Sequence, residues 1–395
     1  MRKFKTIDDL DVSGKRVLVR CDLNAPMKDG RITDNTRLVR AAPTMKELID
    51  KDATVIVISH MGRPQGTFVE SMSLRPVAEE LSKVLDRPVT FIEDCVGAKV
   101  EFALSCMPKG NVALLENLRF HPGEEMNAAG FAGGLAAFGD IYVGDAFSCA
   151  HRSHASIETI ARLLPSVAGR LMQSEVSALA KALGNPQRPV AALVGGSKIS
   201  TKLGVLENLT GKMNLLFLGG GMANTFLHAK GFNVGKSLCE RDMADAARAI
   251  MESAEDKGCE IMLPKDAVTA PELIAGAECE TTPVEDVAGD AMILDVGPAT
   301  VGELSMRLSR FKTVVWNGPL GAFETPPFDA GTNARAVARM TANDGLNSIA
   351  GGGDTLAALA NAGASGSMSY VSTAGGAFLQ WLEGKELPGV AVLYE

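Results

Sequence analysis

Short apolar runs that end in polar clusters recur through the first 150 residues. Four of them are RVLVRCDLN, ATVIVISHMGRP, NVALLENLRFHPG and DIYVGDAFSCAHR. Each run is short and rich in Val, Ile and Leu, and the stretches between them are long enough to hold helices. This pattern is typical of strands that are buried on both faces of a parallel sheet. We therefore expect an α/β fold with a doubly wound sheet in this half of the chain.

The second half has the same rhythm, but most of its apolar runs lead into glycines. The predicted strands are PVAALVGGSKISTK, NLLFLGGGMANT, EIMLPKDAV, AMILDVGPAT, TVVWNGPLGAFE, NSIAGGGDT and SYVSTAGGAF. Glycine turns that open a helix let backbone N–H groups approach a phosphate closely, and the helix dipole adds to the attraction. The second half is therefore expected to bind a nucleotide.

A helical pattern separates the two halves. The stretch PSVAGRLMQSEVSALAKALGNPQRP has a fourfold spacing and ends at GNP, where a glycine and a proline stop a helix. The spaced positions are Leu171, Glu175, Leu179 and Leu183. A chain of 395 residues is also long for a single core. We predict two doubly wound parallel-sheet domains, residues 1–170 and 185–375, joined by a long helix over 171–184 and a hinge.

Composition excludes several classes of protein. The 39 Lys and Arg against 47 Asp and Glu give a net charge of −8, which does not suggest a nucleic-acid binder. No apolar stretch of 18 residues predicts a membrane span. The seven cysteines are widely spaced, odd in number and without a CxxC pair, as expected in a reducing compartment. We expect a cytoplasmic protein without a membrane anchor.

The polar clusters behind the first four strands supply anion-binding chemistry. They are Asp22 and Asn24; His60 and Arg63; Asn117, Arg119 and His121; and Asp145, His151 and Arg152, with Arg37 just past the first strand. Ligand crevices of doubly wound sheets lie beyond the carboxyl ends of the strands, so these clusters are expected to converge. Guanidinium groups pair with carboxylate and phosphate in bidentate geometry, which favours a small polyanion as ligand. The alternative is that each strand simply ends in solvated polar residues.

Two other types of site are alternatives for the stretch DAFSCAHRSH. A zinc site from Asp145, Cys149, His151 and His154 matches no familiar ligand spacing, and the adjacent Arg152 would repel a cation. A catalytic triad built on Ser153 or Ser156 lacks the GxSxG motif and leaves the arginines without a role. Neither alternative explains the residues as well as a bound anion.

Two lysines behind the first glycine turn of the second half are candidate phosphate ligands. Lys198 and Lys202 are four residues apart, and SKISTKLGVLENL predicts a helix that would place both on one face. A solvated lysine pair is the alternative. GFNVGKS is not a P-loop, because Lys230 stands where that motif needs its first glycine, and no GxGxxG motif occurs.

Ten motifs in order across nearly the whole chain resemble those of phosphoglycerate kinases. They are RCDLNAP, ITDNTR, SHMGRP, ENLRFHPGEE, GDAFSCAHRSHAS, GGSKISTK, LGGGMANTF, WNGPLGAFE, GGGDT and STAGGA. The resemblance implies a glycolytic kinase that transfers phosphate between 1,3-bisphosphoglycerate and ADP, giving 3-phosphoglycerate and ATP with Mg²⁺. It also implies a monomer that bends at a hinge, and a segment, residues 376–395, that returns to the N-terminal domain.

The same resemblance assigns site residues motif by motif. It implies a triose-phosphate site at Asp22, Asn24, Arg37, His60, Arg63, Arg119 and Arg152. It implies a nucleotide site at Gly195, Gly196, Lys198, Lys202, Gly219, Gly220, Asn317, Glu324, Gly351, Gly352, Gly353, Asp354 and Thr355, with Asp354 as the metal ligand and Glu324 toward the ribose. The chain departs from the commoner family pattern at Gly144, Ser148–Cys149, Ser197 and Ala374. Ala374 puts a Cβ into a loop that is usually glycine, which bears on the geometry of that loop.

The implied reaction explains why no general base stands out. The nucleophile is a carboxylate that is already ionised at neutral pH, so no proton has to be removed. Arg37 and Lys198 are the expected catalytic residues, because cations stabilise the equatorial oxygens of the transferring phosphoryl group. We expect direct in-line transfer on hinge closure, without a phosphohistidine at His151 or His154. The alternatives are a non-catalytic hinge-closing binding protein for phosphorylated metabolites and a kinase for another small carboxylate.

Overall fold

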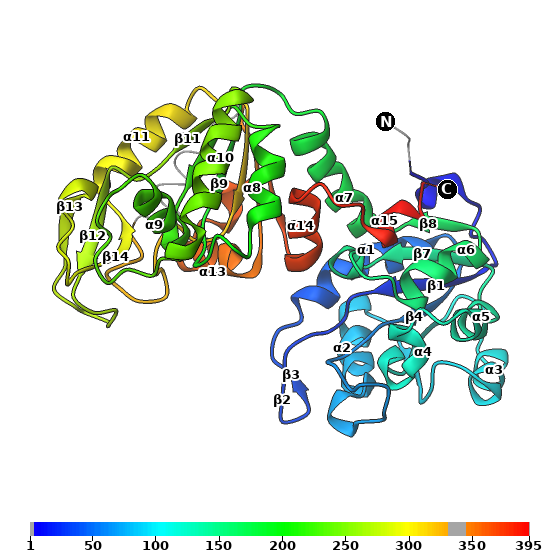
Figure 1. Ribbon diagram of the computed structural model, residues 1–395. Coiled ribbons are helices and arrows are strands. Elements are labelled where there is room, and N and C mark those ends of the chain that lie inside the picture. The colour runs from blue at the N-terminus through cyan, green and yellow to red at the C-terminus, as the bar shows by residue number, and fades with distance from the viewer. Residues whose placement is uncertain (1–3, 331–344, 395) are drawn as a thin grey trace. The chain divides into compact units, whose positions relative to one another are not determined.

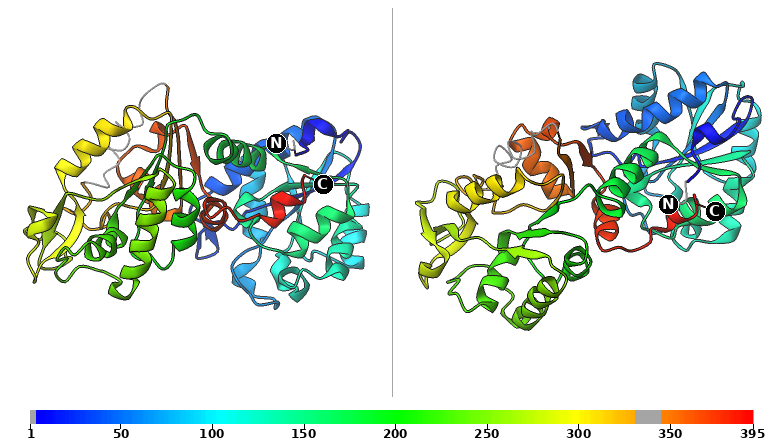
Figure 2. Two further views of the ribbon diagram at one scale, coloured as in Figure 1. Left: turned by 45° about the horizontal axis from the view of Figure 1, so that its top comes forward. Right: turned by 90° about the horizontal axis from the view of Figure 1, so that it is seen from above.

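The computed structural model describes residues 4–330 and 345–394. The chain divides into two compact units, residues 1–176 with 386–395 and residues 177–385. Each unit contains one six-stranded parallel sheet with helices packed around it (Figures 1 and 2). The predicted α/β class with two parallel sheets is therefore confirmed.

The sheet of the first unit has the strand order β5-β6-β4-β1-β7-β8, and all its pairs are parallel. Its strands are β1 (Arg16–Cys21), β4 (Thr54–Ile58), β5 (Val89–Ile92), β6 (Val112–Leu115), β7 (Ile141–Asp145) and β8 (Ser166–Ala168). The four strands predicted here are confirmed. The apolar pattern did not predict β5, in which only one of the four residues is buried, or β8, which has only three residues.

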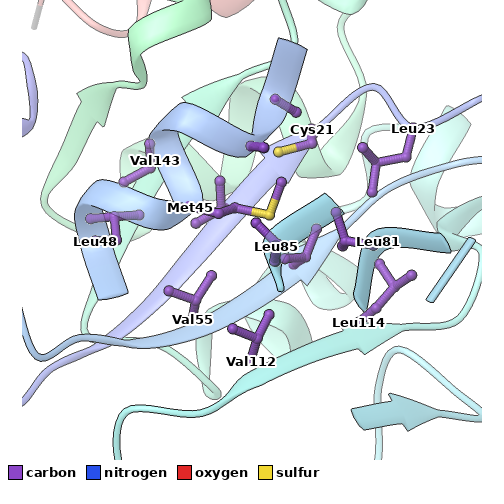
Figure 3. Close-up of a cluster of buried hydrophobic side chains, with 14 of the residues drawn as sticks. Cys21, Leu23, Met45, Leu48, Val55, Leu81, Leu85, Val112, Leu114 and Val143 are labelled. Carbon is purple, nitrogen blue, oxygen red and sulfur yellow. The ribbon is translucent and has the colours of Figure 1, made fainter. Parts of the chain in front are cut away.

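Helices α1 (Thr36–Asp50) and α2 (Arg75–Leu85) bury their apolar sides in one core with this sheet (Figure 3). Met45 of α1 and Leu81 of α2 lie in that core with Val55 of β4. The remaining elements of the unit are α3 (Ala98–Ser105), α4 (Pro122–Glu125), α5 (Ala129–Ala136), α6 (Ile160–Leu163) and a hairpin of β2 (Met27–Lys28) and β3 (Arg31–Ile32). This packing fixes β1, so that the loop that follows β1 is held at the carboxyl ends of the strands.

The parallel sheet of the second unit has the order β11-β10-β9-β15-β16-β17. Its strands are β9 (Val190–Val194), β10 (Leu215–Leu218), β11 (Glu260–Met262), β15 (Thr313–Asn317), β16 (Asn347–Gly351) and β17 (Tyr370–Ser372). A second sheet, antiparallel, pairs β12 (Asp266–Ala270) with β13 (Glu280–Pro283) and β14 (Met292–Val296). EIMLPKDAV, predicted as one strand, thus forms two, and AMILDVGPAT lies outside the parallel sheet.

The helices among the described residues of the second unit are α8 (Leu203–Thr210), α9 (Gly220–Ala229), α10 (Ala244–Asp256), α11 (Pro298–Leu308), α13 (Gly353–Asn361) and α14 (Gly375–Leu382). The prediction that Lys198 and Lys202 share a helical face is wrong, because α8 begins only at Leu203. Ser200 bonds to Glu240 through its backbone N–H and its hydroxyl, and such side-chain bonds compete with helix formation.

The predicted connecting helix is observed as α7 (Arg170–Leu179), which continues into a π-helical turn, Ala180–Gly184. The division between the units falls within α7. Residues from Glu386 onward, with α15 (Pro388–Ala391), belong to the first unit, whereas α14 packs against α8 in the second. The segment predicted to return after about Gly376 therefore includes α14, which stays in the second unit. Within the two described stretches, no helix has both the length and the hydropathy to cross a membrane.

Candidate functional site

The sheet of the first unit reverses its direction of winding between β1 and β7. The chain leaves β1 toward β4 and leaves β7 toward β8, so these neighbouring strands send their loops to opposite sides. Such a switch point opens a crevice at the carboxyl ends of the strands. The loops behind β1, β4 and β7 carry most of the predicted polar residues.

Asp22 directly behind β1 is the anionic centre of this cluster. It forms an ion pair with Arg37 in the first turn of α1 and accepts a hydrogen bond from the Ser148 hydroxyl behind β7. Burial opposes ionisation of Asp22, but the Arg37 guanidinium, the Ser148 hydrogen bond and Arg20 outweigh it and lower its pKa to about 2. Ser148 is one of the departures from the family pattern, and sequence reasoning gave it no role.

Arg20 is a site component that the sequence analysis missed. It lies on β1, is 1% exposed, and donates from Nε to Ser156 Oγ over 2.9 Å. Ser156 Oγ in turn donates to the buried Glu124 carboxylate at 2.6 Å, which places a negative charge behind the arginine. Such pairing is what permits a buried guanidinium. An arginine directly after the apolar run Val17–Val19 of this strand was the available signal.

His60, behind β4, is a neutral imidazole at physiological pH. Its Nδ1 lies 3.3 Å from Arg20 Nη2, where it can accept a hydrogen bond. Burial, together with the positive charge of Arg20, holds the pKa of His60 well below its usual range, although Asp22 opposes the shift. The imidazole therefore contributes hydrogen bonds and shape to the cluster more than charge.

The loop behind β4 is held from two sides at Gly62. Asn24 Oδ1 accepts from the Gly62 N–H at 3.0 Å, and Arg119 Nη1 donates to the Gly62 carbonyl at 2.7 Å. Burial and the charge of Arg152 lower the pKa of Arg119. Arg63 follows Gly62 and is exposed. Arg119 and Arg152 thus add crowded positive charge to the same cluster, which a bound anion would relieve.

Three residues from the predicted clusters have structural roles instead. His121 Nε2 lies 2.8 Å from Asp94 Oδ1, and the His121 ring stacks on Phe131. The Asn117 side chain bonds the backbone of Met61, and Asp145 accepts from the Met172 N–H in α7 at 3.0 Å. The expectation that all the polar residues converge is therefore wrong for His121 and Asp145, whereas Asn117 stays beside the loop that follows β4. Alternate residues of a strand and its continuation point to opposite faces, and position along the chain alone did not distinguish them.

The second unit has its switch point between β9 and β15, where two glycine loops meet. The Gly195 N–H donates to the Asn317 carbonyl at 3.0 Å. A Cβ on Gly195 would lie 1.8 Å from the Pro319 carbonyl oxygen. Gly220, at φ +67°, approaches Gly196 so closely that a Cβ would lie 2.7 Å from the Gly196 oxygen. Only glycine permits this close approach of backbones.

A polar chain runs from Lys202 through Asn317 to the loop behind β16. Lys202 Nζ donates to Asn317 Oδ1 at 2.5 Å, and Asn317 Nδ2 donates to the Gly351 carbonyl at 2.8 Å. The Gly318 N–H donates to Thr355 Oγ1 at 2.7 Å. Burial lowers the pKa of Lys202 to about 8, although the charge of Asp354 opposes the shift. A half-buried ammonium with few anionic partners is suited to receive a phosphate.

A cavity of about 350 Å³ lies beside these loops in the second unit. Gly196, Gly220, Glu324 and Asp354, all predicted nucleotide ligands, line it together with apolar side chains such as Leu238, Met292 and Leu294. The other predicted residues lie in or next to the loops and helix starts that follow β9, β10, β15 and β16: Gly195, Lys198, Lys202, Gly219, Asn317, Gly351, Gly352, Gly353 and Thr355. Of these, Lys198 is exposed.

Ala374 is compatible with an ordinary loop. It is 1% exposed and precedes α14 with φ −91° and ψ 101°, a conformation that L-residues adopt freely. The family's usual glycine is therefore not required by the backbone here.

Comparisons with known proteins agree over the whole chain. The family model for phosphoglycerate kinase matches residues 7–385. A phosphoglycerate kinase of Rhodospirillum centenum is 61% identical over 99% of both chains, and one of Azorhizobium caulinodans is 58% identical over 100% of both. The structure of phosphoglycerate kinase from Coxiella burnetii is similar with a TM-score of 0.93 at 45% identity, covering 99% of both chains.

These similarities decide between the enzyme and the binding-protein alternative in favour of the enzyme. Family members are kinases that bind nucleotides. The chain belongs to the phosphoglycerate kinase family and transfers phosphate between 1,3-bisphosphoglycerate and ADP in glycolysis.

Proposed function

We propose that the cationic cluster of the first unit binds the triose phosphate. The proposed ligands are Asp22, Asn24, Arg37, His60, Arg63, Arg119 and Arg152. The observation that supports this assignment is the concentration of buried or half-buried arginines around one crevice, with Asp22 as the main carboxylate among them. Arg37 is paired with Asp22 and Arg119 with Glu125, and a bound phosphate and carboxylate would add anionic partners for the whole group of guanidiniums.

The nucleotide is proposed to occupy the cavity and the glycine loops of the second unit. Its ligands are the thirteen residues assigned above, from Gly195 to Thr355. The close approach of Gly195, Gly196 and Gly220 supports this role, because glycines without side chains leave room for a phosphate to come close to the backbone. The apolar wall with Leu238 and Met292 suits a base, and Glu324 suits the ribose.

Asp354 is the proposed ligand of Mg²⁺. Its side chain is exposed in the first turn of α13 and lines the cavity, which fits an ion that takes one or two carboxylates beside phosphate oxygens and water. When bound, the ion would neutralise charge on the nucleotide phosphates.

Transfer is proposed to be direct and in line. The carboxylate of 3-phosphoglycerate attacks without loss of a proton, and Arg37 and Lys198 stabilise the charge on the transferring group. Because the two clusters belong to different units, the substrates meet when the units close about a hinge, which also excludes water from the acyl phosphate. The protein is proposed to act as a monomer in the cytoplasm, where its cysteines, none of them disulfide-bonded in the described residues, would stay reduced.

Isotope exchange tests direct transfer. Purified protein with Mg²⁺ should not exchange label between ADP and ATP unless 3-phosphoglycerate is present, because no residue carries the phosphoryl group. Sustained exchange without 3-phosphoglycerate, abolished by His151→Ala or His154→Ala, would replace this mechanism with a phosphohistidine one.

Solution scattering tests closure. The radius of gyration should fall clearly only when 3-phosphoglycerate and a non-reacting MgATP analogue are both present. Equal compaction with the nucleotide analogue alone would contradict closure driven by both substrates.

A further inference from the structure

The wall of the nucleotide cavity contains one amide that the proposed ligand set does not include. Asn224 lies on α9, lines the cavity and is 2% exposed. Its Nδ2 donates to the Leu238 carbonyl at 3.2 Å. The next residue, Thr225, accepts the Glu240 N–H at 3.1 Å through its hydroxyl. This turn of α9 is thus fastened to the segment 238–240, and the amide is held in one orientation.

The oxygen of the same side-chain amide has no hydrogen-bond partner among the described residues. This atom, Asn224 Oδ1, is buried. An amide flip would not relieve it, because the oxygen would then face the Leu238 carbonyl. A buried acceptor without a donor costs on the order of 1–3 kcal/mol, so it marks a place where a donor is expected.

The position of Asn224 indicates which part of a nucleotide supplies that donor. Its bonded neighbour Leu238 also lines the apolar side of the cavity with Met292 and Leu294, where a base fits better than a phosphate. The Leu238 side chain is 48% exposed and reaches over the first turn of α9, since a Cβ on Gly221 would lie 3.0 Å from Leu238 Cδ2. Leu238 and the Asn224 amide therefore lie on the same wall of the cavity.

We propose that Asn224 is a specificity-determining residue that selects adenine, by accepting a hydrogen bond at Oδ1 from the amine on C6 of the base once the base displaces Leu238. Guanine and hypoxanthine carry a carbonyl oxygen at C6, which would face Oδ1 as a second acceptor. The proposal rests on the proposed nucleotide site, and it adds a determinant of which purine is used.

The first test uses the unaltered protein. We measure kcat/KM in the ATP-consuming direction with ATP, ITP and purine riboside 5′-triphosphate, which has only hydrogen at C6. We expect ATP to exceed both analogues by about tenfold or more, the effect of one hydrogen bond in a buried site. Equal kcat/KM for ATP and purine riboside 5′-triphosphate would overturn the proposal without any variant.

The second test is Asn224→Leu, which keeps the approximate volume and removes the acceptor. It should lower kcat/KM for ATP by about tenfold and leave the values for ITP and purine riboside 5′-triphosphate within about twofold, so that the preference disappears. Thr225→Val is the matched control: it removes the bond to the Glu240 N–H on the same turn, and it should retain the ATP preference. Loss of the preference in the control as well would make the role of Asn224 merely structural.

The outcomes also separate this proposal from the proposed site itself. Equal losses for all three nucleotides in Asn224→Leu, with KM for 3-phosphoglycerate unchanged, would keep the nucleotide in the cavity but refute base selection by Asn224. No change for any nucleotide would mean that the base does not bind at this wall, and the proposed nucleotide site would fail too.

Discussion

The two units carry their candidate sites at corresponding places in parallel sheets of the same kind. The first site consists mainly of charged side chains, whereas the second consists mainly of glycine backbone. In the first unit the residues that follow β1, β4 and β7 form a cluster of charged and polar side chains, with Arg20 and His60 buried beside Asp22. In the second unit the loops that follow β9 and β15 bring glycine backbones together, with Lys202 as a half-buried cation beside them. Fold and topology place the site, and local sequence determines its chemistry.

The difference predicts different vulnerabilities. Buried charges must be paired and are sensitive to pH and to loss of a partner, as in the chain from Arg20 through Ser156 to Glu124. Backbone N–H groups do not titrate, but they need space that a single Cβ would fill, as at Gly195. We therefore expect charge substitutions to affect the first site most and added methyl groups to affect the second.

The largest effect is expected from the two proposed catalytic cations. Arg37→Ala and Lys198→Ala should each lower kcat by on the order of 10²-fold or more, because each removes a charge that stabilises the transferring phosphoryl group. Binding of the substrate held by the same unit, measured by calorimetry, should fall much less. Arg87→Ala and Lys230→Ala remove exposed charges from the same two units and serve as controls. Near-normal kcat in either variant would remove that residue from the catalytic pair.

A smaller effect is expected from one methyl group in the second unit. Gly195→Ala should weaken nucleotide binding by roughly tenfold to a hundredfold, because its Cβ would lie 1.8 Å from the Pro319 oxygen and push the two loops apart. Affinity for 3-phosphoglycerate should not change. Gly302→Ala in α11 is the matched control, since no atom lies within 4 Å of its added Cβ and it is not among the proposed nucleotide ligands. The comparison between the units breaks down if both variants bind ATP equally well.

The pH dependence of stability should reveal the buried charges of the first unit. Burial raises the pKa of Asp145 from 3.8 to about 7. Its contribution to stability is fully present below pH 3.8 and is lost as pH rises through 7, because the native protein must then hold a buried carboxylate. We expect Asp145→Asn to abolish a loss of about 2–3 kcal/mol in the free energy of unfolding between pH 5 and pH 8. Urea titrations of both proteins at four pH values measure this, and parallel pH profiles would contradict it.

The smallest expected effect is the uptake of a fraction of a proton by Lys202 when a nucleotide binds. With a pKa of about 8, this ammonium is half deprotonated at pH 8, and nucleotide phosphates should raise its pKa. Binding of MgADP at pH 8 should therefore take up as much as about half a proton, and almost none at pH 6.5. Calorimetry in two buffers of different ionisation enthalpy measures the uptake. Lys202→Arg should abolish it, and an unchanged uptake in that variant would assign the proton to another group.

The sequence predicted the framework of both sites because strand ends are local features. Apolar runs identified the strands behind which Asp22, His60 and Gly195 lie, and the winding rule placed those ends together. The direction of a side chain was not predictable in the same way. Asp145 and His121 follow the same type of strand, yet one bonds α7 and the other bonds Asp94.

The missed residues depend on partners that are distant in the chain. Arg20 is accommodated by Ser156, 136 positions away, and Ser148 bonds Asp22 across 126 positions. No local pattern reports such pairs. The helix predicted at Lys198 failed for a related reason, because Glu240 captures Ser200 from 40 positions away and delays the start of α8.

Because residues 386–394 belong to the first unit, that unit cannot be completed until the ribosome has synthesised the whole of the second unit. The ribosome makes all of the second unit before α15, whose Gly389 N–H bonds the Ala150 carbonyl and which contacts the turn Phe147–Cys149. That turn carries Ser148, the partner of Asp22. A nascent chain therefore exposes a first unit whose proposed triose-phosphate site lacks this support until translation has passed residue 390. Polypeptides that end anywhere in the second unit would lack this support, and we expect them to bind 3-phosphoglycerate more weakly than the full chain.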